Sequence, residues 1–412
     1  MKSIIYNLLT ALLVPAMAVR ILFRSFSDKD YRTDFIHRLG FGYPHLKSNG
    51  HKELIWFHAV SLGEVIGSQQ IVQSLLGRFD LVLTVSTPTG LRKAQEIFGD
   101  DVTIVYAPWD FIFFVKRFFN FYSPTAVAIF ETEIWPSMIS VACSQRIPVY
   151  LLNGRLSARS YKTYKSGQWL FGEAFQQLSY VFVQSQKHCD RFVDLGVPRS
   201  RLQIAGSSKF DLPALNTKPV SLPPYVLAAS THAGEDEMIL RSFKVLQSIS
   251  SLKLCICPRH PDRSLSILAL ALKMGFKVSL YSNLAEDSFD VCIVDSIGRL
   301  SDFYTNAEVA FVGGSLIPHG GHNLIEPAAA GTPILVGPHT FNFEDIVEEF
   351  VAAEACIQVA TEEEFCVNLQ KLTIDNALAQ TLASNATQLI NGKKGSTKVQ
   401  VSYIIKAIGA LN

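Results

Sequence analysis

The sequence has little charge of either sign. Lysine, arginine, aspartate and glutamate together make up 18% of its 412 residues, and the formal net charge at pH 7 is +1. A general nucleic-acid binder normally carries a basic excess, so this balance argues against that class. No internal repeat or low-complexity tract stands out either. At this length a single ordinary core is excluded, and two domains are expected.

Cysteines are also few, and they show no pairing pattern. The seven are odd in number and scattered, and several lie in predicted strands, such as Cys255, Cys257 and Cys292. This usage predicts reduced, buried thiols in a cytosolic compartment rather than a disulfide framework. Cys255 and Cys257 alternate along a strand, so they face opposite ways and are poorly placed to chelate one metal ion.

One segment departs from the globular pattern. Residues 4–23 are almost entirely apolar, and a helix of that length measures about 30 Å, enough to cross a bilayer. Basic residues follow at once, which the positive-inside rule places on the cytoplasmic face. The favoured reading of residues 1–24 is a membrane anchor helix that spans the bilayer or lies in its interface. A cleaved signal peptide, with Ala16-Met17-Ala18 as its cleavage pattern, and a buried soluble helix are the alternatives.

From Glu53 onward, short apolar runs alternate with helical patterns. This order predicts βαβ units, and therefore parallel sheets with helices on both faces. The proline-rich stretch 212–225 has no periodicity and is expected to be a linker. We therefore predict an α/β protein with two doubly wound Rossmann-like domains, 25–211 and 226–412, facing a cleft that holds the active site. This prediction leaves open that the last helices of the chain pack back on the first domain.

Several charged residues follow predicted strands in the first half. Glu64 opens a helix after Trp56–Ser61, and the helix N-terminus should favour its ionised form, as a general base requires. The alternative is a glutamate that only complements the helix dipole. Glu131 and Glu133 follow another strand, where a functional pair or, less favoured, a metal site is considered.

Basic residues accompany these glutamates. Arg155, Arg159 and Lys162 form either a solvated helix face or a basic rim for an anionic acceptor such as a phosphorylated lipid. Lys209 precedes the linker, where a cation could stabilise developing negative charge.

The second half is dominated by FVGGSLIPHGGHNLIEPAAAGTPILVGPHTFNFED, from Phe311 to Asp345. Its glycines predict a loop that approaches a ligand closely and leaves amide groups free for a phosphate, next to a helix N-terminus. Arg259 and His260 end another strand as a predicted phosphate contact, and Asn323 and Glu326 are suited to ribose hydroxyls. His319 and His322 lack a spaced acidic or cysteine partner, so phosphate or backbone contacts are favoured over a metal.

Taken together, these blocks resemble the Kdo transferases (3-deoxy-D-manno-octulosonic acid transferases) of lipopolysaccharide biosynthesis. The resemblance spans nearly the whole chain: the apolar N-terminus, FHAVSLGE, TPTG, ETEIWP, NGRLSARS, SSKFD, STHAGE, PRHP and the long glycine-rich block. It implies a GT-B inverting glycosyltransferase that moves Kdo from CMP-Kdo to the lipid A precursor at the cytoplasmic face of the inner membrane. CMP-Kdo is a substrate, and neither a cofactor nor a metal ion is implied.

The resemblance also implies residue roles. Glu64 matches the general base, and Glu131 and Lys209 match positions that stabilise the transition state. The matching CMP-binding positions are Pro258, Arg259, Ile297, Gly298, Arg299, Gly314, Asn323, Leu324, Ile325 and Glu326. Two residues depart from the usual pattern: Arg299 stands where many relatives have an acidic residue, and Ser208 replaces a leucine.

Three other functions are alternatives to this one. A GT-B transferase that uses a different nucleotide sugar is the nearest alternative, and a non-catalytic sugar-lipid binding module is another. A nicotinamide-dependent oxidoreductase is disfavoured because the first strand–helix turn reads GEVIG rather than G-x-G-x-x-G.

Overall fold

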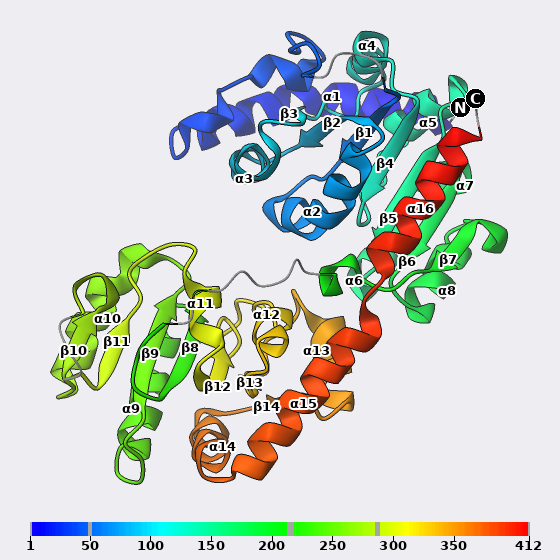
Figure 1. Cartoon of the computed structure of the whole chain (residues 1–412). Helices are drawn as coiled ribbons and strands as arrows, with labels where there is room; N and C mark the ends of the chain where they lie inside the picture. The colour runs from blue at the N-terminus through cyan, green and yellow to red at the C-terminus, as the bar shows by residue number, and fades with distance from the viewer. Residues whose placement is uncertain (1, 48–51, 212–217, 219, 285–288, 411–412) are drawn as a thin grey trace. The chain divides into compact units, whose positions relative to one another are not determined.

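The computed structural model describes residues 2–47, 52–211, 218, 220–284 and 289–410. The chain divides into two units (Figure 1). Residues 1–212 and 394–412 form what we call the N-terminal unit, and residues 213–393 form the C-terminal unit. Of the predicted linker 212–225, residues 212–217 and 219 lie outside the described residues.

The N-terminal unit is built on a parallel sheet of seven strands in the order β3-β2-β1-β4-β5-β6-β7. Its strands are β1 (Leu54–His58), β2 (Asp80–Val85), β3 (Thr103–Tyr106), β4 (Ala126–Phe130), β5 (Val149–Gly154), β6 (Tyr180–Val183) and β7 (Leu202–Ile204). Its helices after the first are α2 (Leu62–Leu76), α3 (Pro88–Phe98), α4 (Ile112–Tyr122), α5 (Pro136–Ser144), α6 (Ala158–Ser166), α7 (Gln168–Gln177), α8 (Gln186–Asp194) and α16 (Ser396–Gly409).

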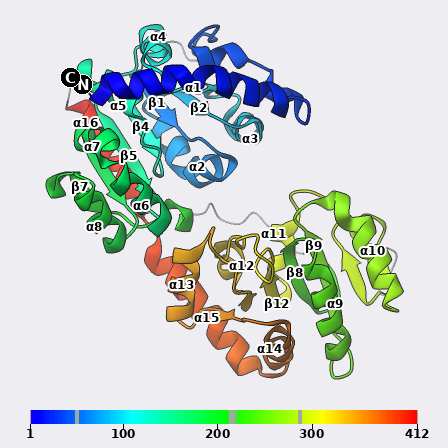
Figure 2. The same cartoon turned by 180° about the vertical axis from the view of Figure 1, so that it is seen from behind.

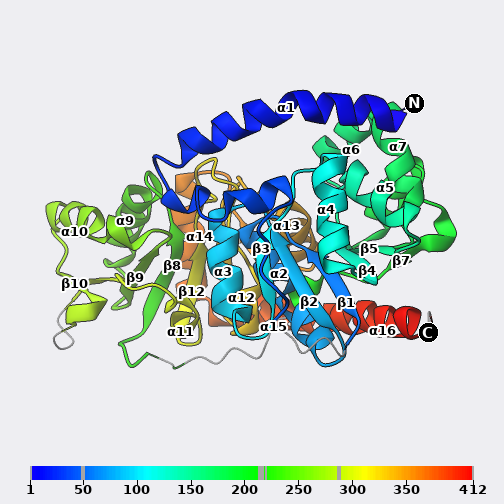
Figure 3. The ribbon, with the colours of Figure 1, turned by 90° about the horizontal axis from the view of Figure 1, so that it is seen from above.

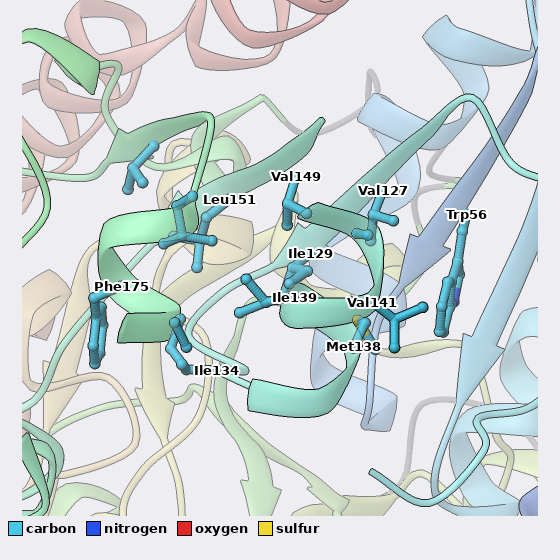
Figure 4. Close-up of a cluster of buried hydrophobic side chains, with 14 of the residues drawn as sticks. Trp56, Val127, Ile129, Ile134, Met138, Ile139, Val141, Val149, Leu151 and Phe175 are labelled. Carbon is cyan, nitrogen blue, oxygen red and sulfur yellow. The ribbon is translucent and has the colours of Figure 1, made fainter. Parts of the chain in front are cut away.

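The strands of this sheet are apolar throughout because helices cover both faces. Successive residues of β1 point to opposite faces, so Trp56 belongs to one core cluster and Phe57 to the other. Figure 4 shows the cluster that contains Trp56, where strand residues meet α5 and α7 through Met138 and Phe175. The other face is covered by α2, α3 and α16, so the last helix of the chain, with Ile404, completes the core of the first unit.

The C-terminal unit repeats this architecture. Its seven parallel strands run in the order β10-β11-β9-β8-β12-β13-β14. They are β8 (Tyr225–Thr231), β9 (Lys253–Pro258), β10 (Val278–Leu280), β11 (Val291–Ile293), β12 (Ala307–Val312), β13 (Ile334–Val336) and β14 (Ile357–Gln358). The helices are α9 (Glu235–Leu246), α10 (Ser264–Lys273), α11 (Leu300–Tyr304), α12 (Ile325–Ala329), α13 (Glu344–Ala352), α14 (Glu362–Ile374) and α15 (Asn376–Lys393). The predicted fold class, α/β with two doubly wound sheets, is confirmed.

The apolar N-terminal segment forms helix α1 (Lys2–Arg24). Among the described residues it is the one helix long and apolar enough to cross a membrane, with a mean hydropathy of 1.8 over Ile5–Arg24. Figures 2 and 3 show α1 running along the outside of the N-terminal unit, and it contacts α5 and α7. Two short 3-10 turns, Lys29–Tyr31 and Phe35–Leu39, lead from it towards β1.

Candidate active site

Glu64 stands in the first turn of α2, directly after β1. The Ser61 hydroxyl accepts a hydrogen bond from the Glu64 amide (3.4 Å) and donates one to Glu64 Oε1 (2.9 Å), while Glu64 Oε2 accepts from the Val60 amide (2.7 Å). The arrangement resembles a capping box, with the Val60 amide in place of the amide of the N-cap Ser61, so Glu64 does have a structural role at the helix start. Each carboxylate oxygen has two lone pairs, so the capping bonds leave acceptor capacity for a further proton.

The pKa of Glu64 differs from the expected direction. Burial is the main cause and the charges of Glu133 and Glu131 add to it, so the pKa rises to about 8. The expectation that the helix N-terminus keeps this group ionised is therefore wrong for the free enzyme. Desolvation and two like charges outweigh the helix dipole and the two capping hydrogen bonds.

Glu131 and Lys209 lie in direct contact beside this group. Lys209 Nζ is 2.8 Å from Glu131 Oε1, and each side chain is 22% exposed. The Lys209 stem passes close to Gly67 of α2, one turn after Glu64. The three residues expected to carry the chemistry therefore gather at the carboxyl-terminal edge of the sheet, where open α/β sheets place their ligands.

The backbone at this edge is unusual. Glu131 follows β4 with φ of 58°, and Asn153 lies in β5 with φ of 53°; both values are in the left-handed region. Asn153 Oδ1 accepts from the Ser208 amide (3.0 Å), and the Ser208 hydroxyl donates to the Gly67 carbonyl (3.2 Å). Asn153 thus positions the segment that carries Lys209, a role missed from the sequence. Its signal was an asparagine followed by glycine at a strand end, since asparagine tolerates left-handed backbone.

The basic segment lies next to the glutamate segment. The Arg155 amide donates to Thr132 Oγ1 (3.2 Å), and the Thr132 hydroxyl donates back to the Arg155 carbonyl. Arg155 is half-buried, whereas Arg159 and Lys162 are exposed on α6. These two are three residues apart, so they share one side of the helix. Their role towards an acceptor remains a prediction.

The glycine-rich loop after β12 is held by internal contacts. A side chain at Gly313 would place its Cβ 2.7 Å from the Ser230 carbonyl oxygen, so the loop crosses the end of β8 with no room to spare. The amides of Gly314, Ser315 and Leu316 donate to the carboxylate of Glu235 at 2.7, 3.0 and 3.0 Å. The expectation that this loop offers free amides to a phosphate is therefore wrong for these three residues.

Glu235 is the organising group of this loop. It is fully buried at the first position of α9, and it also accepts from the His232 amide at 2.9 Å. Four amide donors compensate for the burial of one carboxylate. Three of these amides lie 79 to 81 positions further along the chain, so no local pattern in the sequence predicts the pairing.

A group of basic side chains surrounds the loop. His232 Nε2 and His322 Nε2 are 2.9 Å apart, and the rings of His232 and His319 stack at 4.3 Å. Burial and the neighbouring histidines and arginines lower the pKa of both His232 and His322 to about 4. The imidazoles of His232 and His322 are therefore neutral near pH 7, and the nearby Arg259 supplies positive charge that suits an anion.

Arg259, in the PRHP segment at the end of β9, lies near residues of the glycine-rich loop. It follows Pro258, the buried last residue of β9, and its side chain is exposed. Its charge acts on the pKa of both His322 and Glu326, more than sixty residues away in sequence. The PRHP and HGGHN segments therefore meet at one edge of the second sheet, as a nucleotide site requires.

The predicted ribose ligands hold each other in place. Asn323 Oδ1 accepts from the Ile325 amide (3.0 Å), and Asn323 Nδ2 donates to Glu326 Oε1 (3.3 Å). Leu324 and Ile325 are buried, so they support this turn through packing. Helix α12 has only five residues and one of its first amides is already bonded, so its dipole adds less than expected.

In the Ile297–Arg299 turn, the side chain of Ile297 is exposed to solvent. Ile297 is 86% exposed and Gly298 has φ of 79°. Arg299, by contrast, donates to Asp302 (2.7 Å) and to the Tyr281 hydroxyl (3.3 Å). Arg299 is therefore committed to local contacts, and it remains only a predicted CMP ligand.

Relatives of the chain identify the family. A family model described as 3-deoxy-D-manno-octulosonic-acid transferase (kdotransferase) matches residues 33–212. A 3-deoxy-D-manno-octulosonic acid transferase of Haemophilus influenzae is 36% identical over 321 residues, which cover 74% of this chain and 75% of that protein. The chain belongs to the Kdo transferase family. A Bordetella pertussis transferase of the same description is 31% identical over 84% of this chain and 85% of its own length.

Solved structures confirm the GT-B-like fold of this Kdo transferase. UDP-GlcNAc 2-epimerase from Neisseria meningitidis matches with a TM-score of 0.59 at 13% identity, covering 86% of this chain and all of that one. Anabaena HepE in complex with UDP and glucose matches with a TM-score of 0.57 at 12% identity, over 87% of this chain and all of that one. At such low identity the likeness concerns the fold alone. Among the described residues of the transferase, no group of three or more His, Cys, Asp or Glu side chains is arranged to hold a metal ion.

Proposed function

We propose that this transferase moves Kdo from CMP-Kdo onto a hydroxyl of the lipid A precursor with inversion, and that Glu64 is the general base. The observation that carries the proposal is the cluster of Glu64 with the contacting pair Glu131 and Lys209. A buried carboxylate with a pKa near the working pH is suited to accept a proton from an alcohol.

In the proposed step one bond forms and one breaks at the anomeric carbon. The acceptor oxygen attacks this carbon while its proton passes to a Glu64 carboxylate oxygen. The bond from the anomeric carbon to the CMP phosphate oxygen breaks, and its electron pair leaves on CMP. The sugar carries positive charge in the transition state, so the carboxylate of Glu131, held by Lys209, stabilises it electrostatically.

The C-terminal unit is assigned to the donor. Arg259 is the exposed cation at the strand ends, and we assign it to the phosphate of CMP. Asn323 and Glu326 are assigned to the ribose hydroxyls because their polar atoms face one turn. The loop amides are occupied by Glu235, so the proposal gives the phosphate charge to side chains, without a metal ion.

The acceptor and the membrane belong to the N-terminal unit. Arg155, Arg159 and Lys162 are proposed to meet the phosphates of the lipid acceptor, since arginine binds phosphate bidentately. Helix α1 is proposed as the anchor that keeps the enzyme on the inner membrane, with both units on the cytoplasmic side.

The direct test combines purified protein and lipid A precursor with CMP-Kdo generated in situ beforehand, and EDTA is added to a parallel reaction once the donor has formed. Mass spectrometry of the lipid should show the addition of Kdo, and calorimetry should show that CMP binds and UDP does not. Binding of UDP in preference to CMP, or no mass increase with active donor present, would rule out the proposed donor. Loss of activity with EDTA alone would rule out the metal-independent step.

A further inference from the structure

Helix α1 presents the opposite faces from those of an ordinary surface helix. The half-buried side that faces the N-terminal unit carries small and polar residues, such as Asn7, Thr10 and Ala18, together with Val14 and Ile21. Large apolar side chains point outward, with Leu8 60% exposed and Leu12 77% exposed. A surface helix normally buries its apolar face against the core. This outer apolar row consists of Ile5, Leu8, Leu9, Leu12, Leu13, Met17, Val19, Leu22, Phe23 and, just beyond the helix, Phe26.

The beginning of α1 is fixed to the folded unit by polar contacts. The Tyr6 hydroxyl donates to Asp110 Oδ2 at 2.7 Å, and its ring lies edge-on to Phe171 of α7. Asn7 Oδ1 accepts from the Ile112 amide at 3.0 Å. These bonds connect the first two turns of the helix to the start of α4 and to α7.

The end of α1 is fixed to the same unit. Ser25 is buried, and its hydroxyl accepts from Arg32 Nε at 2.7 Å. The following turn is tied down by ion pairs of Asp28 and Asp30 with Arg92 of α3. Both ends of the apolar helix therefore contact one folded body.

This double attachment is incompatible with a transmembrane path. Tyr6 and Ser25 are separated by roughly 28 Å along the helix, close to the roughly 30 Å thickness of the hydrocarbon core. A spanning helix would place them at opposite faces of the bilayer, yet both bind the N-terminal unit. We propose that α1 lies in the plane of one membrane leaflet, with its outer apolar row among the lipid chains and its polar side on the enzyme. This inference rests on the proposed membrane location, but not on the proposed chemistry.

Charge favours a lipid surface as the occupant of this face. The first 27 residues contain three basic residues, Lys2, Arg20 and Arg24, and no acidic one. Anionic headgroups attract such a segment, whereas a second copy of the chain would bring the same cations together. A row of nine exposed apolar residues on one helix, extended by Phe26, also fits a shallow apolar layer better than solvent.

The attachment also links the membrane surface to the catalytic segment. The carboxylate that binds Tyr6, that of Asp110, accepts from the amides of Ser137 (2.9 Å) and Met138 (2.8 Å) at the start of α5. This helix directly follows the segment 131–135 that carries Glu131. The contact between Tyr6 and Asp110 therefore fixes the distance between segment 131–135 and the membrane leaflet, where a lipid acceptor presents its headgroup.

The test compares the sides on which two cysteines lie in native membranes. Cys143 is exposed on α5 and reports the side of the N-terminal unit. A Ser3→Cys/Cys143→Ser variant reports the side of the helix start, and the partly exposed Cys366 is replaced by serine in both proteins. A membrane-impermeant maleimide is applied to intact spheroplasts and to inverted vesicles. Labelling of both cysteines in the same preparation is the expected result.

The other labelling outcomes distinguish failure of this inference from failure of the proposed membrane location. Labelling of the two cysteines from opposite sides means that α1 spans the bilayer, which overturns this inference and leaves the proposed membrane location intact. Recovery of the full-length enzyme in the soluble fraction overturns both. Leu12→Asp should lower partition into vesicles that contain anionic lipid by at least about tenfold, while Leu265→Asp, at a leucine on α10 that is 69% exposed, should not change it.

The hydrogen bond between Tyr6 and Asp110 can be tested separately, through the KM for the acceptor. Tyr6→Phe removes only the hydroxyl that binds Asp110, and it should raise KM for acceptor in vesicles without changing turnover of detergent-dispersed acceptor. Thr10→Val is the matched control, because the Thr10 hydroxyl bonds only to carbonyls of its own helix. The contact of Tyr6 with Asp110 does not position the enzyme on the membrane if both variants raise the KM equally. The same conclusion follows if Tyr6→Phe lowers the activity on detergent-dispersed acceptor as much as the activity in vesicles.

Discussion

Replacing Glu64 with glutamine separates the chemistry of this residue from its structural role. Glutamine keeps a carbonyl oxygen that accepts from the Val60 amide, and glutamine is an accepted partner in a capping box. It cannot take a proton from the acceptor. Glu64→Gln should therefore abolish transfer while leaving the fold, and CMP binding by the C-terminal unit, unchanged.

The expected magnitudes follow from the site. A positioned general base contributes roughly 10²–10⁴-fold, so kcat should fall by at least about 10²-fold. With a pKa of about 8, the wild-type group is roughly one-tenth ionised at pH 7 and nine-tenths ionised at pH 9. The wild-type rate should accordingly rise about tenfold across that interval, and any residual rate of the variant should lack this rise.

Stability provides an independent check with a defined sign. The folded-state pKa of Glu64 lies above its ordinary value of 4.5, so the folded protein binds this proton more tightly than the unfolded chain. The resulting stabilisation is complete below pH 4.5 and is lost as the pH rises through about 8. Glu64→Gln removes this loss, so its melting temperature should exceed that of the wild type at pH 8 and converge with it near pH 5. A variant that retains more than about a tenth of the rate, or that melts lower at pH 8, would refute the reasoning.

Three further substitutions test the surroundings. Glu133→Gln removes a charge that raises the pKa of Glu64, so the rising limb of the kcat/KM profile should move to lower pH; an unmoved limb would contradict the assigned cause. Glu235→Ala leaves four amides, two of them buried, without their acceptor and should cost about 3 kcal/mol or more in urea unfolding; full stability would show that the loop finds other partners. Arg259→Ala should weaken CMP binding by about 10- to 100-fold in calorimetry, and Arg299→Ala, whose guanidinium already bonds within its own unit, should weaken it less.

The fold was largely predictable because its strands are buried on both faces. Segments such as 103–106, 126–130 and 180–183 read as continuous apolar runs, and the structure places strands with these bounds. Strand β14, Ile357–Gln358, was not predicted, since two residues carry no periodicity. Helix α2 begins at Leu62 rather than at Glu64, because Ser61 supplies the cap two residues earlier.

The site was predicted in its residue types but not in its electrostatics. The strand-end positions of Glu64 and Glu131 follow from parallel topology, which brings carboxyl ends to one edge. The partners of Glu235 and the docking of Tyr6 on Asp110 join residues 79 to 104 positions apart, and no local pattern encodes such pairs. The pKa of Glu64 likewise depends on burial and on distant charges, whereas the sequence displayed only the helix start.

The grouping of carboxylates around Glu64 has a chemical consequence. Glu64 is buried beside Glu131 and Glu133, whose charges raise its pKa, and Lys209 contacts Glu131. Such a site disfavours a charged Glu64 in the ground state and keeps its proton affinity high. In the proposed mechanism, positive charge that develops on the sugar and the proton that leaves the acceptor both meet these carboxylates in the transition state. An arrangement that is unfavourable in the empty protein therefore becomes favourable as the reaction proceeds, which is the direction in which interactions must change to raise the rate.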